Sequence, residues 1–334
     1  MSEMSSDRSV SGRSSAARTR SFPLPEFCLV ALLGALALRG IIREHTSQAF
    51  AHWATIFLAI VLQAMPFMVL GVVLSGVIAA FVRPAALARV LPKNRALAVP
   101  VAAVAGVFLP GCECSSVPVA ARLAQRGVPF SAAMAFLLAS PAINPVVLVA
   151  TAVAFPGRPM MMIARFVASV IAASVVGLWW ERFGNPGWLS QAFANRSKEV
   201  TNPWRELVDT ALHDFSHAAG FLVIGGATAA TLQTVVSRSI LKTLGDTGWL
   251  AVVILGLLAV VLSICSEADA FVAAGLTQFS LTARLAFLVV GPMVDLKLIA
   301  LQTGTFGRNF ALRFAPLTFV VALLVSSIVG TVLL

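Results

Sequence analysis

The sequence predicts an all-α integral membrane protein, with about seven full spans and two re-entrant helical hairpins arranged as an inverted structural repeat behind an extra N-terminal helix. Composition is the first reason: 59% of the residues are hydrophobic, only 11% are charged and the mean hydropathy is +0.92, whereas a soluble domain carries about 25% charged residues. The apolar runs are continuous rather than alternating, which favours helices over a β-barrel. The third reason is that the second half of the chain repeats the order of segments found in the first half.

The formal net charge of +10 does not indicate a nucleic-acid partner, because the positions of the basic residues explain it. They occur in the short connections between apolar segments, where Lys and Arg set the orientation of the spans. Four cysteines, of which Cys28 falls in the first apolar segment, are too few for a disulfide scaffold. We therefore expect a multi-pass protein of the inner (plasma) membrane without a cofactor. Its expected partners are the lipid bilayer and a small-molecule substrate, and a homo-oligomer is left open.

The N-terminal part of the chain has two expected segments. Residues 1–22 are rich in Ser and Arg and predict a disordered basic tail, and an extra N-terminal transmembrane helix follows at 23–45. The tripeptide at 35–37 resembles a signal-peptide cleavage site, while Glu3 and Asp7 argue against a transit peptide. We expect an uncleaved cytoplasmic tail and leave open whether it is processed.

The first membrane repeat is expected at 53–181. It opens with an apolar span and continues, after a basic connection, with an apolar segment at 96–109. A helix of that length is roughly 21 Å long, too short to cross a hydrocarbon core of ~30 Å. The sequence Phe-Leu-Pro-Gly-Cys-Glu-Cys-Ser-Ser-Val-Pro at 108–118 interrupts it, and a second short helix follows. Two half-length helices that meet at a Pro-Gly turn predict a re-entrant hairpin, whose non-helical tip needs protein or a wet cavity around it.

A longer apolar segment at 130–155 follows, interrupted by Ser140 and Pro141. A serine followed by a proline is typical of a helix N-cap and first helical position, so this pair predicts a new helix N-terminus inside the membrane. Another span at 160–180 completes the repeat. The polar stretch at 182–215 then predicts a cytoplasmic linker that becomes helical from about Trp204.

The second membrane repeat, expected at 216–334, has the same order of apolar segments and is interrupted at Gly291-Pro292. Cys265 lies 153 residues after Cys112, and Asp295 lies 151 residues after Asn144, so one small insertion relates the halves. If each hairpin enters and leaves on one side, each half has an odd number of full spans and the second half is inverted. The positive-inside rule favours this layout over a parallel repeat in which each hairpin crosses as one bent span.

The interrupted segments of both halves are expected to meet at the membrane midplane, where inverted-repeat transporters bind their ligands. Thiolates bind soft ions, and a helix N-terminus favours the thiolate. The alternative is that the small cysteines only pack a tight hairpin. No metal site is assigned, because the spacing of zinc-ribbon cysteines is absent. The expected substrate-binding residues are Cys112, Glu113, Cys114, Cys265, Ser115 and Asn144.

Further ionisable residues in apolar sequence are expected either to couple protons to transport or to pair charges. These are Glu267, Asp269, Asp295 and Lys297. The structural alternative for Lys297 is that it neutralises one of the acids Asp295, Asp269 or Glu267. The remaining acids would then be available to relay protons.

These motifs resemble the organoarsenical efflux permease family (ArsP-type). The resemblance rests on the sequence at 108–118, on Ser-Pro-Ala-Ile-Asn-Pro at 140–145 and on Cys-Ser-Glu-Ala-Asp-Ala-Phe at 265–271, and it leaves the tail and the first helix outside. It implies an inner-membrane permease that exports trivalent methylated arsenicals through cysteine thiols, a role that Cys112, Cys114 and Cys265 would inherit. The family is broad, and the motifs identify the permease scaffold more securely than the cargo.

The favoured function is a membrane permease, a secondary transporter that exports a thiol-reactive trivalent (methyl)arsenical, and not an enzyme. An ion gradient or passive facilitation is the expected drive, because the sequence contains no Walker motif. The first alternative is a permease for another small solute, such as a sulfur-containing metabolite or a soft metal species. The least favoured is a membrane thiol oxidoreductase in which Cys112 and Cys114 form a disulfide, which their single intervening residue would strain.

Overall fold

The computed structural model describes residues 48–81, 92, 94–109, 113–184, 203–235 and 248–334. The chain divides between Ala51 and His52, and residues from His52 onward form one compact unit. The described residues are helical apart from short connections, with no β-strand among them, as expected for an all-α protein. The expected tail, the expected N-terminal helix and Cys112 lie outside the described residues.

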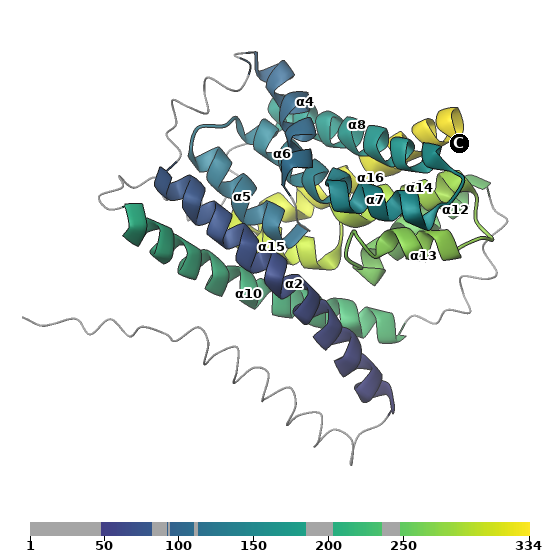
Figure 1. The fold of residues 1–334 in the computed structure, drawn as a ribbon, viewed down its shortest axis with the longest axis horizontal. Helices are drawn as coiled ribbons and strands as arrows, with labels where there is room; N and C mark the ends of the chain where they lie inside the picture. The colour runs from purple at the N-terminus through teal and green to yellow at the C-terminus, as the bar shows by residue number, and fades with distance from the viewer. Residues whose placement is uncertain (1–47, 82–91, 93, 110–112, 185–202, 236–247) are drawn as a thin grey trace, which may run out of the picture. The chain divides into compact units, whose positions relative to one another are not determined.

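The two halves of the chain contain helices in the same order (Figure 1). The first half comprises α2 (Gln48–Phe81), α4 (Arg95–Ala105), the 3₁₀ turn η1 (Gly106–Phe108), α5 (Glu113–Gln125), α6 (Phe130–Ile143), α7 (Pro145–Ala154) and α8 (Pro159–Phe183). The second half comprises α10 (Pro203–Val235), α12 (Gly248–Leu262), α13 (Asp269–Gly275), α14 (Leu281–Met293), α15 (Leu296–Phe306) and α16 (Arg308–Leu333). Each half thus has a long helix, two short helices, an interrupted helix and a final long helix.

Five helical segments in the described residues are long and apolar enough to cross a membrane. They are Phe50–Ile78, Phe130–Ala154, Pro159–Phe183, Leu281–Phe306 and Arg308–Leu333. The expected count was about seven. Of the other two expected spans, the N-terminal one lies outside the described residues, and the one at the start of the second repeat falls within α10, which has 33 residues and is not among the five. The count of seven and the inverted arrangement stay predictions.

Both interrupted spans break where the sequence indicated, but the new helix begins later than expected. Helix α6 continues through Ser140 and Pro141, and Asn144 is the first extended residue, with φ −61° and ψ 152°. Its side chain accepts a hydrogen bond from the Val147 backbone N–H at 2.9 Å and so caps α7. The reason is that Pro145 forces the residue before it out of the helical region, so the expected N-terminus at Ser140 is wrong by a turn of helix.

The second interrupted span is capped in the same way. Helix α14 runs through Pro292 to Met293, and Asp295 caps α15 by accepting from the Leu298 backbone N–H at 2.5 Å. Asn144 and Asp295 are the two residues that the internal duplication matches. The two halves therefore use equivalent side chains to restart their helices.

Small side chains allow α8 to pack closely against α6 and α16. Its buried face repeats every three to four residues and includes Ala164, Ala168, Ala172 and Gly177. A Cβ at Gly177 would lie 2.9 Å from the Ser131 carbonyl oxygen. Close backbone approach at small residues is typical of helix packing in membranes, where burial of apolar surface gives little drive.

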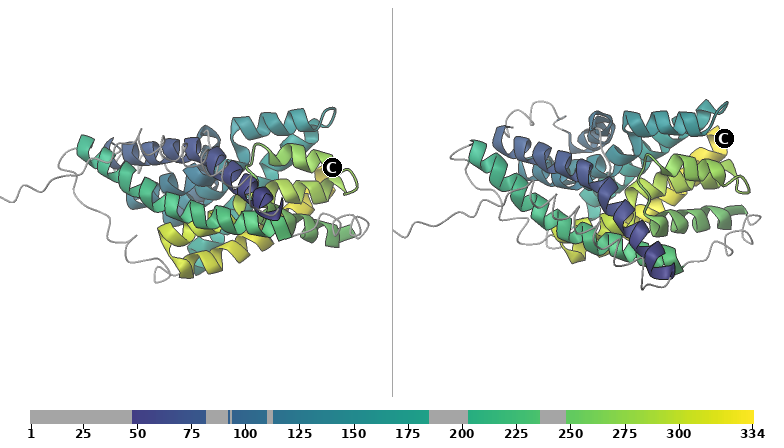
Figure 2. Two further views of the ribbon diagram at one scale, coloured as in Figure 1. Left: turned by 90° about the horizontal axis from the view of Figure 1, so that it is seen from below. Right: turned by 60° about the horizontal axis from the view of Figure 1, so that its bottom comes forward.

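The long helices α2 and α10 lie side by side and antiparallel (Figure 2). At one end the Trp53 indole N–H donates to the Thr231 hydroxyl at 3.0 Å. Toward the other end, a Cβ at Gly76 would lie 2.9 Å from the Leu207 carbonyl oxygen. The two helices also share a sequence pattern, since Phe-Met-Val-Leu-Gly at 67–71 is followed 154 residues later by Phe-Leu-Val-Ile-Gly at 221–225. The equivalent helices of the two halves therefore contact each other.

Candidate functional site

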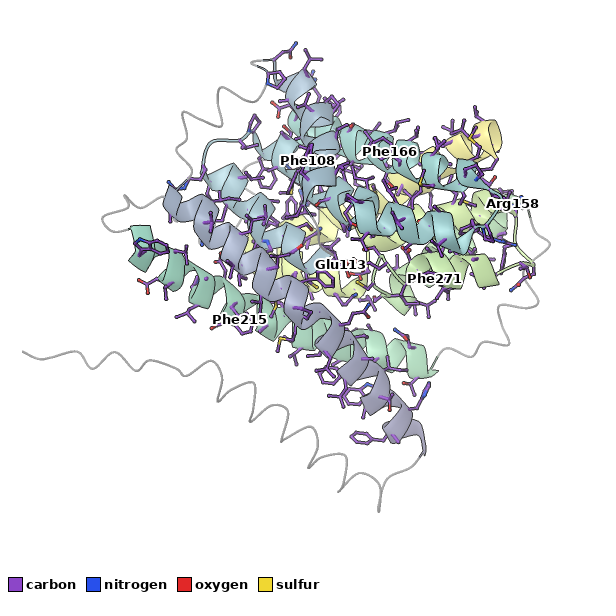
Figure 3. All side chains as sticks on the ribbon, viewed as in Figure 1. Phe108, Glu113, Arg158, Phe166, Phe215 and Phe271 are labelled. Carbon is purple, nitrogen blue, oxygen red and sulfur yellow. The ribbon has the colours of Figure 1, made fainter. Side chains whose placement is uncertain are left out.

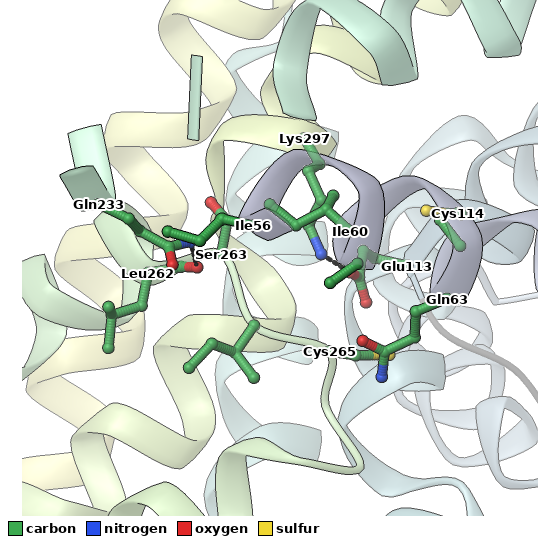
Figure 4. A pocket seen from close by; sticks show the side chains of 13 residues that line it. Ile56, Ile60, Gln63, Glu113, Cys114, Gln233, Leu262, Ser263, Cys265 and Lys297 are labelled. Atoms are coloured by element: carbon green, nitrogen blue, oxygen red, sulfur yellow. Dashed lines mark hydrogen bonds and ion pairs between the residues drawn. The ribbon is translucent and has the colours of Figure 1, made fainter. Parts of the chain in front are cut away.

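A cavity of about 210 Å³ lies between the two halves (Figure 4). Its walls come from α2, the first turn of α5, the end of α10, the connection after α12 and the first turn of α15. The lining residues are Ile56, Ala59, Ile60, Gln63, Ala64, Glu113, Cys114, Gln233, Leu262, Ser263, Ile264, Cys265 and Lys297. Apolar walls with a few polar groups are typical of small-ligand sites.

One wall of the cavity carries a buried ion pair between the halves. Glu113 is the first residue of α5 and lies where α2, α5 and α15 come together (Figure 3). The Lys297 Nζ lies 2.7 Å from Glu113 Oε1 and 3.4 Å from Asp295 Oδ2. Glu113 Oε2 is buried and has no hydrogen-bond partner among the described residues. One ammonium is thus shared between two carboxylates, and one carboxylate oxygen remains available beside the cavity.

Two glycines let the helices that carry this ion pair approach the long helices. A Cβ at Gly225 of α10 would lie 2.9 Å from the Lys297 Cα, and a Cβ at Gly71 of α2 would lie 2.5 Å from the Ser115 Cα. A real Cβ does not come so close to another backbone atom. These positions therefore need glycine because α15 and α5 pack there backbone to backbone.

The connection after α12 brings Cys265 to the cavity. Ser263 ends the helix in the left-handed region, with φ 44°, and its hydroxyl donates to the Val260 carbonyl at 2.8 Å and accepts from the Leu296 backbone N–H at 3.2 Å. The Cys265 thiol donates to Glu267 Oε2 at 2.6 Å. Cys114 and Cys265 come from opposite halves and line the same cavity.

A second buried ion pair fixes the far end of this connection. Arg165 of α8 is completely buried and pairs with both Asp269 carboxylate oxygens at 2.9 Å. It also donates to the Ser266 carbonyl at 3.3 Å and to the Thr151 hydroxyl at 2.9 Å. A two-pronged guanidinium–carboxylate contact is directional as well as strong. The first half of the chain thus holds the segment that carries Cys265.

Comparison with known proteins identifies the family. The ArsP_1 family model, described as "Predicted permease", matches residues 49–331. The chain belongs to this permease family. It is 35% identical to the UPF0718 protein YcgR of Bacillus subtilis (strain 168) over 289 residues, which cover 84% of this chain and 96% of that protein. A second relative, from Streptococcus mutans (serotype c, strain ATCC 700610 / UA159), is named as a candidate subunit of a two-component membrane permease complex. The chain is 31% identical to it over 308 residues, which cover 86% of this chain and 98% of that protein. No solved structure matches the chain.

The family and the apolar helices make this permease a multi-pass protein of the plasma membrane. The resemblance seen in the sequence is confirmed at the level of the family. Its arsenical cargo is not tested by these relatives, because neither printed name states a substrate.

The structure brings together some of the residues that the sequence singled out. Glu113, Cys114, Cys265 and Lys297 all line the cavity. Asp295 and Glu267 do not line it but contact Lys297 and Cys265, which do. The closer partner of Lys297 is Glu113, which was not among the acids expected to neutralise it. The sequence did not indicate this pair because the two residues are 184 positions apart and meet only through the packing of α5 against α15.

Other expected site residues of the permease lie elsewhere. Asn144 caps α7 and Ser115 packs against Gly71, and neither lines the cavity. Asp269 pairs with Arg165. Sequence reasoning missed Arg165, although an arginine within the apolar part of a 25-residue helix was itself a signal of a buried partner. The described parts of the chain contain no group of three or more His, Cys, Asp or Glu side chains that could hold a metal ion.

Proposed function

We propose that this permease is a secondary transporter that moves a small solute through the cavity between its two halves. The observation that carries the proposal is the cavity itself: it is lined by side chains of both halves and contains two thiols, a carboxylate and an ammonium group. Ionisable groups in such apolar surroundings are costly to keep and are typical of transport sites. A site shared by two halves can face either side of the membrane when the halves move relative to each other.

We infer further that the halves form an inverted repeat. Equivalent helices meet antiparallel: α2 lies along α10, and Trp180 near the end of α8 packs on Phe310 near the start of α16, with ring centroids 4.9 Å apart. A two-fold axis also exchanges the contacts of α2 and α10. Under the 154-residue relation, Gly76 corresponds to residue 230 and Leu207 corresponds to Trp53. The Gly76–Leu207 contact therefore predicts a contact between Trp53 and residue 230, one position from the observed Trp53–Thr231 contact. An axis that reverses helix direction lies in the membrane plane, as an inverted repeat requires.

The solute that best fits the lining is a thiol-reactive, trivalent (methyl)arsenical. Cys114 and Cys265 would supply sulfur ligands from opposite halves, and Cys112 precedes Glu113 in the chain. Glu113 Oε2 would accept a hydrogen bond from a hydroxyl of the solute. Lys297 would balance the charge of Glu113 and is shared with Asp295. As each As–S bond forms, an As–OH bond would break, and the thiol proton, taken up by Glu267 in the case of Cys265, would leave with the hydroxide as water. Soft thiolates prefer soft, thiol-reactive elements over hard ions.

The alternative cargo is a sulfur-containing metabolite or a soft metal species, bound in the same cavity with the cysteines as weaker ligands. A thiol oxidoreductase, in which Cys112 and Cys114 would form a disulfide, is less favoured, because their single intervening residue would strain such a bond. One relative's name gives a two-component complex, so we also propose that a second protein component assists this chain.

Uptake of methylarsenite into everted membrane vesicles tests the proposal, with the chain expressed alone and in its native host. We expect uptake with the native chain and loss of most of it with Cys114→Ser and with Cys265→Ser. Cys28→Ser is the matched control and should keep native uptake. Uptake that is equal in all three variants would overturn the role of the thiols. If vesicles with the native chain accumulate no methylarsenite, both when the chain is expressed alone and when it is expressed in its native host, the arsenical cargo is overturned.

A further inference from the structure

A second polar cluster joins the halves away from the cavity. Arg122, in the last turn of α5, contacts Asp214 of α10 through three bonds: Nη2 lies 3.0 Å from each carboxylate oxygen and Nε lies 3.2 Å from Oδ2. The Ser75 hydroxyl of α2 donates to the same Oδ2 at 3.0 Å, and Gln125 accepts from Arg122 Nη1 at 2.9 Å. The cluster is almost fully buried, with 7% of Arg122 and 9% of Asp214 exposed.

This cluster lies toward the other end of two helices that line the cavity. Helix α5 starts at the cavity with Glu113 and reaches Arg122 nine residues later, roughly 13 Å along its axis. Helix α2 lines the cavity up to Ala64 and reaches Ser75 eleven residues later, roughly 16 Å away. A pocket beside the cluster has a volume of about 20 Å³, which is enough for about one water molecule.

The equivalent positions in the other half carry no ion pair. The relation that matches α2 to α10 by 154 residues pairs Asp214 with Ile60, and the relation that matches Cys112 to Cys265 by 153 residues pairs Arg122 with Gly275. Ile60 lines the cavity of about 210 Å³. A Cβ at Gly275 would meet no atom within 4 Å. One pair of related positions thus carries a buried ion pair, whereas neither Ile60 nor Gly275 carries a charge and Ile60 borders the cavity.

We propose that Arg122, Asp214 and Ser75 form the closed gate of the transport path, and that the structure is the state in which the cavity opens at the opposite end. The inference rests on the proposed transport function. Opening the gate means separating α5 from α10 and α2, and a buried ion pair that loses one partner is strongly destabilised. Water or solute entering from the gate side would then contact Arg122, Asp214 and Ser75 in place of the partners that they lose.

Side-specific labelling of Cys114 tests this proposal without any cargo. The full chain carries Cys28→Ser, Cys112→Ser and Cys265→Ser, and a small membrane-impermeant methanethiosulfonate reagent is added to right-side-out or to everted vesicles. We expect Cys114 to react from one side only before any gate substitution. Arg122→Gln and Asp214→Asn should make it react from the other side too, at least about tenfold faster. Arg126→Gln, which removes a neighbouring charge outside the cluster, is the matched control.

Two further variants separate opening of the gate from unfolding. Ser75→Ala removes one hydrogen bond to Asp214 but keeps the ion pair, so it should give a smaller increase from the gate side. The exchanged pair Arg122→Asp with Asp214→Arg should restore one-sided labelling. Fast labelling from both sides before any gate substitution, or Arg122→Gln and Asp214→Asn behaving like Arg126→Gln, would overturn the gate. A chain that shows the expected labelling but takes up no methylarsenite would keep the gate and reject the cargo.

Discussion

At the scale of single residues, the main feature of this permease is that buried charged side chains of one half pair with those of the other half. Within the part of the chain that the structure describes, three buried ion pairs join its halves: Arg122–Asp214, Arg165–Asp269 and Lys297–Glu113. A buried pair need not stabilise a protein more than apolar side chains of the same size, but removing one partner leaves a charge without compensation. Such pairs therefore make the arrangement of the halves specific more than they make it stable.

The Glu113–Lys297 pair offers a test of this view. Lys297→Met leaves two buried carboxylates without their ammonium and should destabilise the protein by about 3–5 kcal/mol. The double variant Glu113→Gln with Lys297→Met should lose less than Lys297→Met alone, because only Asp295 then remains uncompensated. Unfolding of the purified protein in detergent measures these two variants and Glu113→Gln alone, with the exposed Arg158→Gln as control. If the double variant loses the sum of the two single changes, the residues do not act as a pair.

At the scale of elements, glycine positions decide how the long helices meet the interrupted ones. The backbone of α15 approaches α10 at Gly225, and the backbone of α5 approaches α2 at Gly71. Each contact fixes a first-turn residue at or beside the site. One is Lys297, which lines the cavity, and the other is Ser115, the neighbour of Cys114. The polar caps at Asn144 and Asp295 then determine where the interrupted spans restart. Packing and capping together place the cavity's charged groups.

A pair of alanine substitutions in α10 separates this contact from helix propensity. Gly225→Ala places a Cβ 2.9 Å from the Lys297 Cα, so it should push α15 away and lower both thermal stability and methylarsenite uptake. Gly220→Ala has no atom within 4 Å and should be neutral, or stabilise by about 0.5–1 kcal/mol through helix propensity. Melting temperature and vesicle uptake of the two variants give the answer. Equal behaviour of the two would show that the close approach at Gly225 does not matter.

At the scale of the whole molecule, the direction of the hairpins decides the topology. Helix α4 and helix α5 are each too short to cross a membrane alone. If the first hairpin is re-entrant, both of its ends lie on one side and the repeat is inverted. If α4 and α5 cross as one bent span, the ends lie on opposite sides and the repeat is parallel.

Labelling at the two ends of this hairpin distinguishes the topologies. Asn94 directly precedes α4 and Arg126 directly follows α5. We expect Asn94→Cys and Arg126→Cys to react with an impermeant maleimide from the same side of the membrane, the cytoplasmic one. Arg158→Cys, in the turn before α8, should react from the other side and controls for vesicle orientation. Reaction of the first two positions from opposite sides would reject the inverted repeat.

The sequence alone predicted much of the fold and part of the candidate site. The interruptions near Pro141 and Pro292 were visible because proline and its polar neighbours act locally, although the caps proved to be Asn144 and Asp295. The residues Glu113, Cys114, Cys265 and Lys297 were found because ionisable and thiol groups are unusual in apolar sequence. Arg165 was missed because the apolar helix around it was interpreted only as a span.

What the sequence by itself determined is the class of protein, the order of its helices and their duplication, because composition, length and local breaks are properties of neighbouring residues. Only the tertiary structure decided which charges meet. Lys297 contacts Glu113 across 184 residues, Arg165 contacts Asp269 across 104 and Arg122 contacts Asp214 across 92. Such contacts depend on which helix faces pack together, and in a chain with apolar residues on nearly every face the hydrophobic pattern does not specify them.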